Sequence, residues 1–143
     1  MTESRLRIVV KFGSGILANA RGTALDARQF QRLAGEIAAL VAARHEVIVV
    51  SSGAVAAGLG TLGLKERPEE LAAIQACAAI GQSALMQMYG SMFKEHGLAV
   101  AQLLLTYRDL DSRVSYANAQ NTIERLPAGL VLDEIVKAHG GET

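Results

Sequence analysis

The sequence has few of the residues that build disulfides, metal clusters and rigid turns. Its 143 residues include one cysteine, two prolines and no tryptophan. The single Cys77 cannot form an intramolecular disulfide, and no Cys/His cluster has zinc-like spacing. We therefore expect a protein of the reducing cytoplasm without a protein-bound metal, in which Cys77 is a small core residue.

The chain also lacks a net charge and a long apolar run. Lys plus Arg and Asp plus Glu number 14 each, so the formal net charge is zero, which argues against a nucleic acid or an anionic membrane surface as the main partner. No run reaches the roughly 18 apolar residues of a membrane span, and no long apolar stretch follows Met1–Arg7 as in a secretion signal. We expect a cytoplasmic protein with no membrane partner.

What the sequence does have is an alternation of apolar runs with amphipathic stretches. Short apolar runs predict buried strands at 6–10, 47–50 and 98–105. Apolar residues three and four apart predict helices at 26–44, 69–96 and 109–126. A short helix at 55–59 is expected to lead into a loose glycine-marked connection over 58–63. Runs that are apolar on both faces belong to a parallel sheet, so the predicted fold is α/β, with a parallel sheet sandwiched between helices.

Two of the predicted strands end in small, glycine-bearing turns, Lys11–Gly15 and Ser51–Ala54. Ligands bind at this edge of parallel sheets, where glycine lets the backbone approach an anion and exposed N–H groups attract it. Lys11 adds a full charge that suits a phosphoryl group. The alternative is that the glycines only permit tight turns and that Lys11 is a solvated cation. Neither turn has the spacing of a Walker loop or a dinucleotide fingerprint.

Five segments, in their order and spacing, resemble the amino acid kinase family. They are VVKFGSG (Val9–Gly15), VVSSGAVAAG (Val49–Gly58), QACAAIGQ (Gln75–Gln82), LLTYRD (Leu104–Asp109) and SYANAQNTI (Ser115–Ile123). The first two are shared by several kinases of the family, and the last three together are similar to the glutamate 5-kinases within it. The resemblance covers residues 6 to about 126.

This resemblance implies phosphorylation of the γ-carboxylate of L-glutamate, with ATP and Mg²⁺, in proline biosynthesis. Lys11 would be the catalytic residue that contacts the transferred phosphate, and Gly13, Ser14 and Gly15 would face the phosphates of the nucleotide. Both reactants are anionic, so the site needs positive charge and oriented N–H groups. An ionised carboxylate is already a nucleophile, so no general base is required.

The same resemblance implies a glutamate site at the second turn. Ser52, Gly53 and Ala54 would line it, with backbone N–H groups and the Ser52 hydroxyl meeting carboxylate oxygens. Asn118 and Asn121 are the remaining polar candidates for substrate binding. The histidines, at positions 45, 96 and 139, are expected to be solvent-facing or capping rather than catalytic.

The sequence departs from the family after residue 126. The N-E-N-D and G-D-N-D segments and the nucleotide-binding half of the family are absent, so we expect residues 1–126 to be an acyl-substrate and phosphate-binding half and 127–143 a divergent tail. An amphipathic terminal helix is the favoured interpretation of this tail. Two others stay open: Asp133–Ile135 is similar to the D-E-I that follows N-E-N-D, as after a deletion, and Glu134–Glu142 resembles the closing helix of a histidine-kinase ATP-binding domain.

Three functions follow from these patterns. The first is a glutamate 5-kinase-like phosphotransferase, whose 143-residue chain is expected to be inactive alone because the nucleotide-binding half is absent. The second is a non-catalytic carboxylate- or phosphate-binding or assembly module that forms a homo-oligomer through the 69–96 helix, since the apolar face of that helix is broader than a small domain usually buries. The third is another acyl- or phosphate-kinase of the same family.

Overall fold

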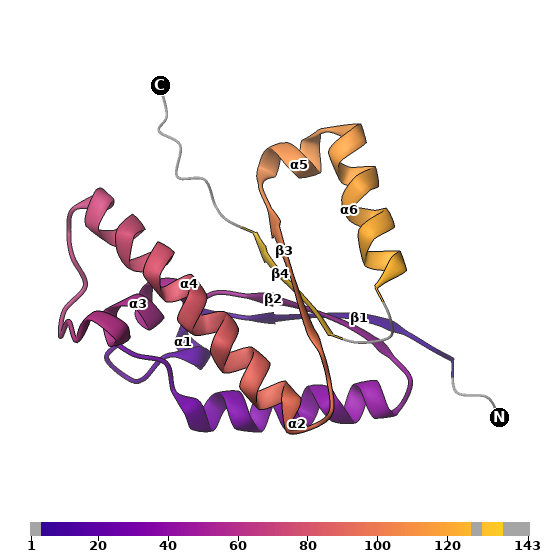
Figure 1. Cartoon of the computed structure of the whole chain (residues 1–143), viewed down its shortest axis with the longest axis horizontal. Helices are drawn as coiled ribbons and strands as arrows, with labels where there is room; N and C mark the ends of the chain where they lie inside the picture. Colours follow the sequence, from indigo (N-terminus) through magenta and orange to yellow (C-terminus); the bar gives the residue numbers. More distant parts are fainter. Residues whose placement is uncertain (1–3, 127–129, 136–143) are drawn as a thin grey trace.

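The structure, a computed structural model, describes residues 4–126 and 130–135, and within them it has the predicted α/β class (Figure 1). The strands are β1 (Arg7–Phe12), β2 (Glu46–Ser51), β3 (Val100–Leu105) and β4 (Leu130–Ile135). The helices are α1 (Ser14–Leu17), α2 (Ala27–Ala42), α3 (Ala54–Leu62), α4 (Leu71–Lys94), α5 (Tyr107–Asp111) and α6 (Arg113–Arg125).

The strands form one parallel sheet in the order β1-β2-β4-β3. Along the β1–β2 pair, Arg7 lies beside Glu46 at one end and Phe12 beside Ser51 at the other. Because every strand runs in the same direction, the carboxyl ends of all of them meet at one edge of the sheet. Both glycine-bearing turns leave the sheet at this edge.

Strand β4 shows that a terminal helix was the wrong prediction for residues 130–135. They form a parallel strand between β2 and β3 instead. The short apolar run Leu130–Leu132 suits a strand, and pairing on both sides satisfies the backbone N–H and C=O groups of the segment. The rest of the predicted tail lies outside the described residues, and the boundary at 126 stays a prediction.

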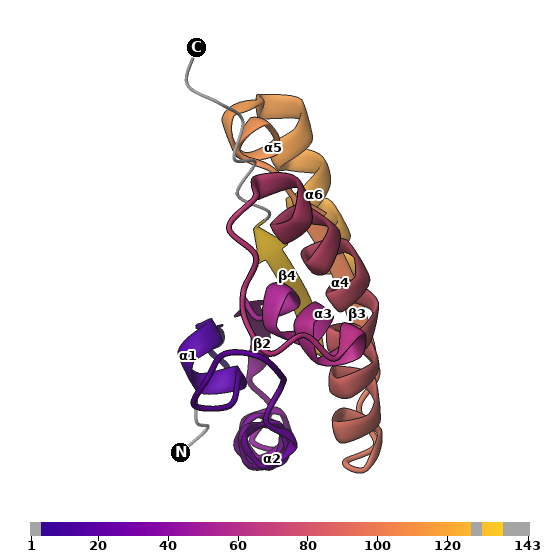
Figure 2. The same cartoon turned by 90° about the vertical axis from the view of Figure 1, so that its left-hand side faces the viewer.

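The hydrophobic core lies on one face of the sheet, under α2 and α4. Its buried side chains include Phe12, Val47, Val49, Phe30, Leu33, Ile37, Leu85, Tyr89 and Phe93. Successive strand residues point to opposite faces, so Val47 and Val49 face the helices while Val9, on the other face of β1, is 63% exposed. Figure 2 shows α2 end-on below the strands, with α4 running alongside them.

Two stretches differ from the sequence prediction in their local structure. The glycines at 58–63 do not form a loose connection, because Gly58 and Gly60 lie inside α3 and Gly63 ends it with a φ of 67°. The helix predicted over 109–126 is divided into α5 and α6 at Ser112. The Ser112 hydroxyl accepts a hydrogen bond from the N–H of Ser115, a capping contact that competes with helix continuation.

Helix α4 passes a length and composition test for a membrane span, with a mean hydropathy of 1.2 over 18 residues. The core helix of a soluble protein passes the same test, so this is weak evidence for a membrane. The buried positions of α4 recur every four residues, at Cys77, Gly81, Leu85, Tyr89 and Phe93. They form one face that packs on α3, α2 and β3, whereas 17% of the 18-residue window is buried in all. Cys77 lies on the buried face, which confirms the prediction for it.

Candidate functional site

The two glycine-bearing turns lie side by side at the carboxyl edge of the sheet. The N–H of Ser52 donates to the carbonyl oxygen of Phe12 at 2.9 Å, which extends the β1–β2 ladder by one residue into the turns. The chain leaves β1 through Gly13 into α1, and leaves β2 through Gly53 into α3. The structure therefore brings together the two turns that the sequence marked as candidate ligand loops.

Lys11 stands at the end of β1 on the face opposite the core. Its neighbour Phe12 is buried, so the alternation of the strand sends Lys11 the other way, and its side chain is exposed. In the ladder it lies beside Val50 of β2. Within residues 4–126 and 130–135, Lys11 makes no ion pair. A cation at this position is free to meet an anion.

The first turn does not need its glycines for backbone conformation. Gly13 has a φ of −76°, which any residue adopts, and Gly15 has no positive φ. A Cβ added to either glycine would meet no described atom within 4 Å. The tight-turn interpretation therefore fails at Gly13. Bare backbone beside Lys11 is what close approach of an anionic group requires.

The second turn does need a glycine. Gly53 has a φ of 109°, in the left-handed region, and it packs against Leu17 and Leu25. Its N–H has no hydrogen-bond partner among the described residues, and no side chain caps the first turn of α3, where Ala54 begins the helix. The N–H of Ser52 is already used by Phe12, so the groups left for a ligand are the Ser52 hydroxyl and the N–H groups from Gly53 onward.

Helix α4 presses closely on the start of α3. A Cβ on Gly81 would overlap the carbonyl oxygen of Ala54, and a Cβ on Gly58 would overlap the carbonyl oxygen of Cys77. The two helices cross through these glycines with backbone against backbone. This contact fixes the height and angle at which α3 starts, and with them the positions of its first N–H groups.

A buried pair of hydroxyls under the second turn was missed by the sequence reasoning. Ser51 Oγ lies 2.6 Å from the phenolic oxygen of Tyr89, and the Ser51 hydroxyl donates to the carbonyl oxygen of Ser52 at 3.0 Å. Two signals could have found it. Ser51 continues the core-facing alternation of Val47 and Val49, and Tyr89 is a polar-tipped residue on the apolar face of α4. Buried hydroxyls at such positions require partners.

The end of β3 contributes a helix start rather than a free charge. The carboxylate of Asp109 accepts from both the N–H and the hydroxyl of Thr106, each at 2.7 Å, which completes a capping box at α5. The hydrogen bond from the Thr106 side chain, followed by that from its backbone, holds the pKa of Asp109 below its ordinary value. The carboxylate is thus committed to the backbone of its own loop.

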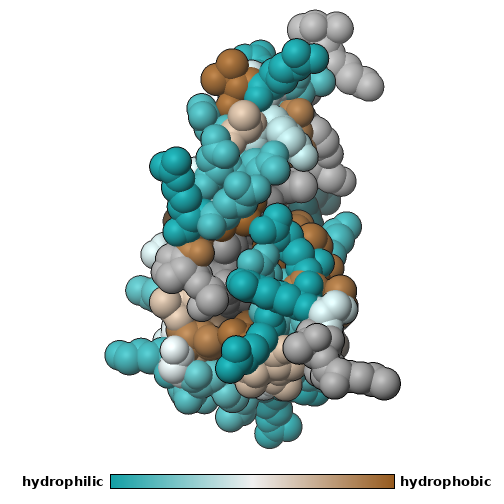
Figure 3. Space-filling model, turned by 90° about the vertical axis from the view of Figure 1, so that its right-hand side faces the viewer, coloured by the Kyte–Doolittle hydropathy of each residue, from teal (hydrophilic) through white to brown (hydrophobic). Residues whose placement is uncertain are grey.

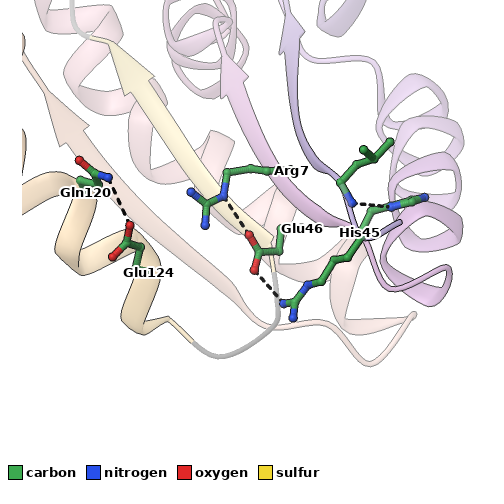
Figure 4. Close-up of polar contacts among 7 residues, drawn as sticks. Arg7, His45, Glu46, Gln120 and Glu124 are labelled. Carbon is green, nitrogen blue, oxygen red and sulfur yellow. Dashed lines mark hydrogen bonds and ion pairs between the residues drawn. The ribbon is translucent and has the colours of Figure 1, made fainter. Parts of the chain in front are cut away.

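The opposite edge of the sheet carries paired charges (Figure 4). Glu46 accepts from Arg5 Nη2 at 2.7 Å and from Arg7 Nε at 2.8 Å, and the hydrogen bond from Arg7 is the main reason that the pKa of Glu46 is lowered. His45 Nδ1 accepts from the N–H of Leu6 at 3.2 Å. Figure 3 shows one side of the molecule, where hydrophilic atoms predominate and hydrophobic areas are separate.

A comparison with family models identifies the family to which the chain is related. Residues 6–139 match the model described as the amino acid kinase family. The chain belongs to the amino acid kinase family. The match runs past residue 126 and includes β4, the strand that sequence reasoning interpreted as a helix.

Proteins named glutamate 5-kinase are among the relatives of this chain. Those of Burkholderia cenocepacia, Burkholderia mallei and Burkholderia multivorans are each 49% identical to it over 117 residues. The aligned part is 82% of this chain and 31% of each relative, so the chain spans about a third of the length of these relatives. The recognition made from the five motifs is confirmed at the level of the family and of homology to glutamate 5-kinases.

Asn118 and Asn121 lie apart from the two glycine-bearing turns. Both are exposed on α6, which Figures 1 and 2 show on the far side of the molecule from α1 and α3. The carbonyl of Asn118 accepts from the hydroxyl of Thr122 within the helix. No hydrogen bond joins either side chain to the turns within the described residues. Their role in binding substrate stays a prediction.

The described residues hold no group of three or more His, Cys, Asp or Glu side chains that could hold a metal ion. Amino acid kinases use ATP with Mg²⁺, an ion that is commonly bound through substrate phosphates with few protein ligands. The groups that this site offers to such a complex are a lysine and backbone N–H groups, which suit the phosphates rather than the metal.

Proposed function

We propose that this chain supplies the carboxylate- and phosphate-binding turns for ATP-dependent phosphorylation of the γ-carboxylate of L-glutamate. The observation that carries the proposal is the junction of the two turns: the Ser52 N–H bonds to the Phe12 carbonyl, directly after the exposed Lys11, which makes no ion pair with any described residue. The 49% identity to proteins named glutamate 5-kinase supports this reaction over others of the family. The reaction belongs to proline biosynthesis in the cytoplasm.

The first turn binds the phosphate groups in this proposal. Lys11 contacts the phosphoryl group in transfer and offsets its negative charge, and the bare backbone of Gly13, Ser14 and Gly15 faces the phosphates of ATP. Charge balance of this kind and alignment of the reactants are the main sources of rate in phosphoryl transfer. ATP, with Mg²⁺ on its phosphates, supplies the phosphoryl group.

The second turn holds the glutamate. The hydroxyl of Ser52 and the N–H groups of Gly53 and Ala54 donate to carboxylate oxygens, since these donors lack other partners among the described residues. Asn118 and Asn121 of α6 are the further candidates for substrate contact. Alanine substitution of either asparagine tests that role, and glutamate binding that is unchanged would remove it from the site.

Titration of the ¹⁵N-labelled chain with L-glutamate tests the proposal. Glutamate is expected to shift the amide resonances of Gly53 and Ala54, and ATP·Mg²⁺ those of Gly13 and Gly15. L-Aspartate, N-acetylglutamate and UMP, tested as alternative substrates of the family, should shift them less at equal concentration. Larger shifts with one of these three would assign the chain to a different acyl- or phosphate-kinase, and no shift with any of them would end the proposal.

We also propose that the 143-residue polypeptide does not complete the phosphoryl transfer by itself, because it aligns with 31% of the length of the glutamate 5-kinases. An ATP-dependent hydroxamate assay reports the acyl phosphate directly. Robust turnover of the purified chain would overturn this statement while leaving the binding proposal intact.

A second function, assembly of identical chains through α4, is favoured by one observation. Ile80 is 40% exposed on this helix, which buries one face through Cys77, Gly81, Leu85, Tyr89 and Phe93. Apolar area of this kind is buried when two copies pair. Sedimentation velocity should show a dimer that Ile80→Lys dissociates, and a wild-type chain that is monomeric at all concentrations would exclude it.

A further inference from the structure

We infer that Tyr89 and Ser51 are positioning residues that aim the N–H of Gly53 at the substrate carboxylate. This inference rests on the proposed function, because it names how the second turn is set for its ligand. Neither residue is exposed: Tyr89 is 3% exposed and Ser51 is 8% exposed. They act through the peptide between Ser52 and Gly53.

The direction of the two hydrogen bonds follows from the number of protons. A serine hydroxyl has one proton, and that of Ser51 is donated to the carbonyl oxygen of Ser52 at 3.0 Å. The contact of 2.6 Å between Ser51 Oγ and the Tyr89 oxygen must then be donated by tyrosine. The result is a short chain of donors from Tyr89 through Ser51 to the Ser52 carbonyl. Bonds in such chains polarise and strengthen one another.

The chain of donors fixes the peptide that carries the Gly53 N–H. In a trans peptide the C=O and the N–H point in opposite directions, and no cis bond occurs in the described residues. Holding the Ser52 carbonyl toward the Ser51 hydroxyl therefore holds the Gly53 N–H away from it. The φ of 109° at Gly53 makes this orientation one that other residues rarely adopt. An N–H set in advance binds a carboxylate without reorganisation.

The tyrosine is itself held in place by the core. Its ring meets Phe30 of α2 edge-on at 4.9 Å between centroids and stacks on Phe93 of α4 at 6.1 Å. These contacts do not involve the hydroxyl, so a phenylalanine at position 89 keeps them. Tyr89→Phe therefore removes the donor while preserving the packing of α2 against α4.

The test compares Tyr89→Phe with Tyr116→Phe, the same substitution on the exposed face of α6. Tyr89→Phe is expected to weaken L-glutamate binding by about fivefold, the size of one neutral hydrogen bond, and to leave ATP·Mg²⁺ binding at the first turn unchanged. It should also shift the Gly53 amide resonance in the absence of ligand. Tyr116→Phe should change none of these. Equal losses for glutamate and ATP would show general loosening and overturn the inference.

A double-mutant cycle with Ser51→Ala isolates the pair. Other contacts of the Tyr89 hydroxyl count equally in both backgrounds, so they cancel in the cycle. Once Ser51 is alanine, the further change Tyr89→Phe should no longer alter glutamate affinity or the Gly53 resonance. Additive effects would overturn the inference. If wild-type chain does not bind glutamate, the proposed function fails, and the ligand-free Gly53 resonance still decides whether Tyr89 and Ser51 set this peptide.

Discussion

The two edges of the sheet handle charge in opposite ways. At the amino edge, Arg5 and Arg7 both bond to Glu46, so each of these cations has a carboxylate partner. At the carboxyl edge, Lys11 has no ion pair among the described residues, and the one nearby capping carboxylate, Asp109, is bonded to Thr106. Paired surface charges contribute little to stability. The difference leaves Lys11, which has no such partner among the described residues, available to an anionic ligand at the carboxyl edge.

The edges also differ in what holds them. The amino edge is held by side-chain contacts between exposed residues, those of Arg5 and Arg7 with Glu46 (Figure 4). The carboxyl edge is held by backbone and core contacts: Ser52 to Phe12, Gly81 against Ala54, and Tyr89 to Ser51. Such supports give a binding site its precision, because the binding groups need not be ordered when the ligand arrives.

Removing the close helix crossing should have the largest effect. Gly81→Ala places a Cβ on the carbonyl of Ala54, so α3 and α4 must separate, at a cost of about 3 kcal/mol in unfolding free energy. Gly90→Ala on the same helix meets no described atom within 4 Å and should gain up to ~1 kcal/mol from helix propensity. Urea unfolding of both variants measures the contrast. Equal stabilities would show that the crossing does not support this edge.

Replacing Lys11 tests whether the two edges of the sheet differ in their ability to bind an anion. Lys11→Met should weaken ATP·Mg²⁺ binding by roughly tenfold or more, the size of a charge-assisted hydrogen bond. Arg7 lies four residues before Lys11, on the same face of β1. Arg7→Met removes a charge that is already paired with Glu46 and should leave ATP·Mg²⁺ binding unchanged. Calorimetric titration of each variant with ATP·Mg²⁺ gives both values. If Arg7→Met weakens binding as much, the edges do not differ.

The sequence was sufficient for the parts of the fold that repeat a regular pattern. Strands β1 and β2 and helix α2 follow from apolar spacing, and Asp26 caps α2 by accepting from the N–H of Arg28 at 3.0 Å. Strand β4 was missed because a segment as short as Leu130–Ile135 fits a helix or a strand, and the choice depends on pairing with β2 and β3, which lie far away in sequence. The second half of α3 was expected to be a loose connection because glycine disfavours helices, but Gly58 is needed where α4 crosses.

The candidate site divides in the same way. Lys11 and the two glycine-bearing turns could be found because glycines beside a strand end form a local pattern. Tyr89 and Ser51 could not be paired from sequence, since they are 38 positions apart and meet only through the packing of α4 on β2. The use of the Ser52 N–H by Phe12 was hidden for the same reason, because it depends on strand register.

Asp109, at the carboxyl edge, should make the stability of the fold depend on pH without changing glutamate affinity. The pKa of Asp109 is lowered in the folded protein, chiefly by the Thr106 hydroxyl, so its contribution to stability is present above the unfolded pKa, about 3.9, and is lost as pH falls through the folded value. Asp109→Ala should lower the urea midpoint at pH 7, flatten its decline below pH 4 and leave glutamate affinity unchanged. Asp111→Ala, two residues on, is the control. A loss of glutamate affinity in Asp109→Ala alone would place this carboxylate in the site.

The smallest effect is expected at the amino edge. The hydrogen bond from Arg7 is the main cause that lowers the pKa of Glu46, so the stabilisation from this carboxylate is present above about pH 4.3 and is lost as pH falls through the folded value. Glu46→Gln should reduce the urea midpoint slightly at pH 7 and low salt, and the reduction should vanish at pH 3 or in 1 M salt, where the charge is neutralised or screened to about 3 Å. Glu66→Gln, which removes an exposed carboxylate without an ion pair in the described residues, should show neither dependence. A reduction that persists in high salt would mean that the amino edge is held by more than exposed charge, and the contrast between the edges would then rest on Lys11 alone.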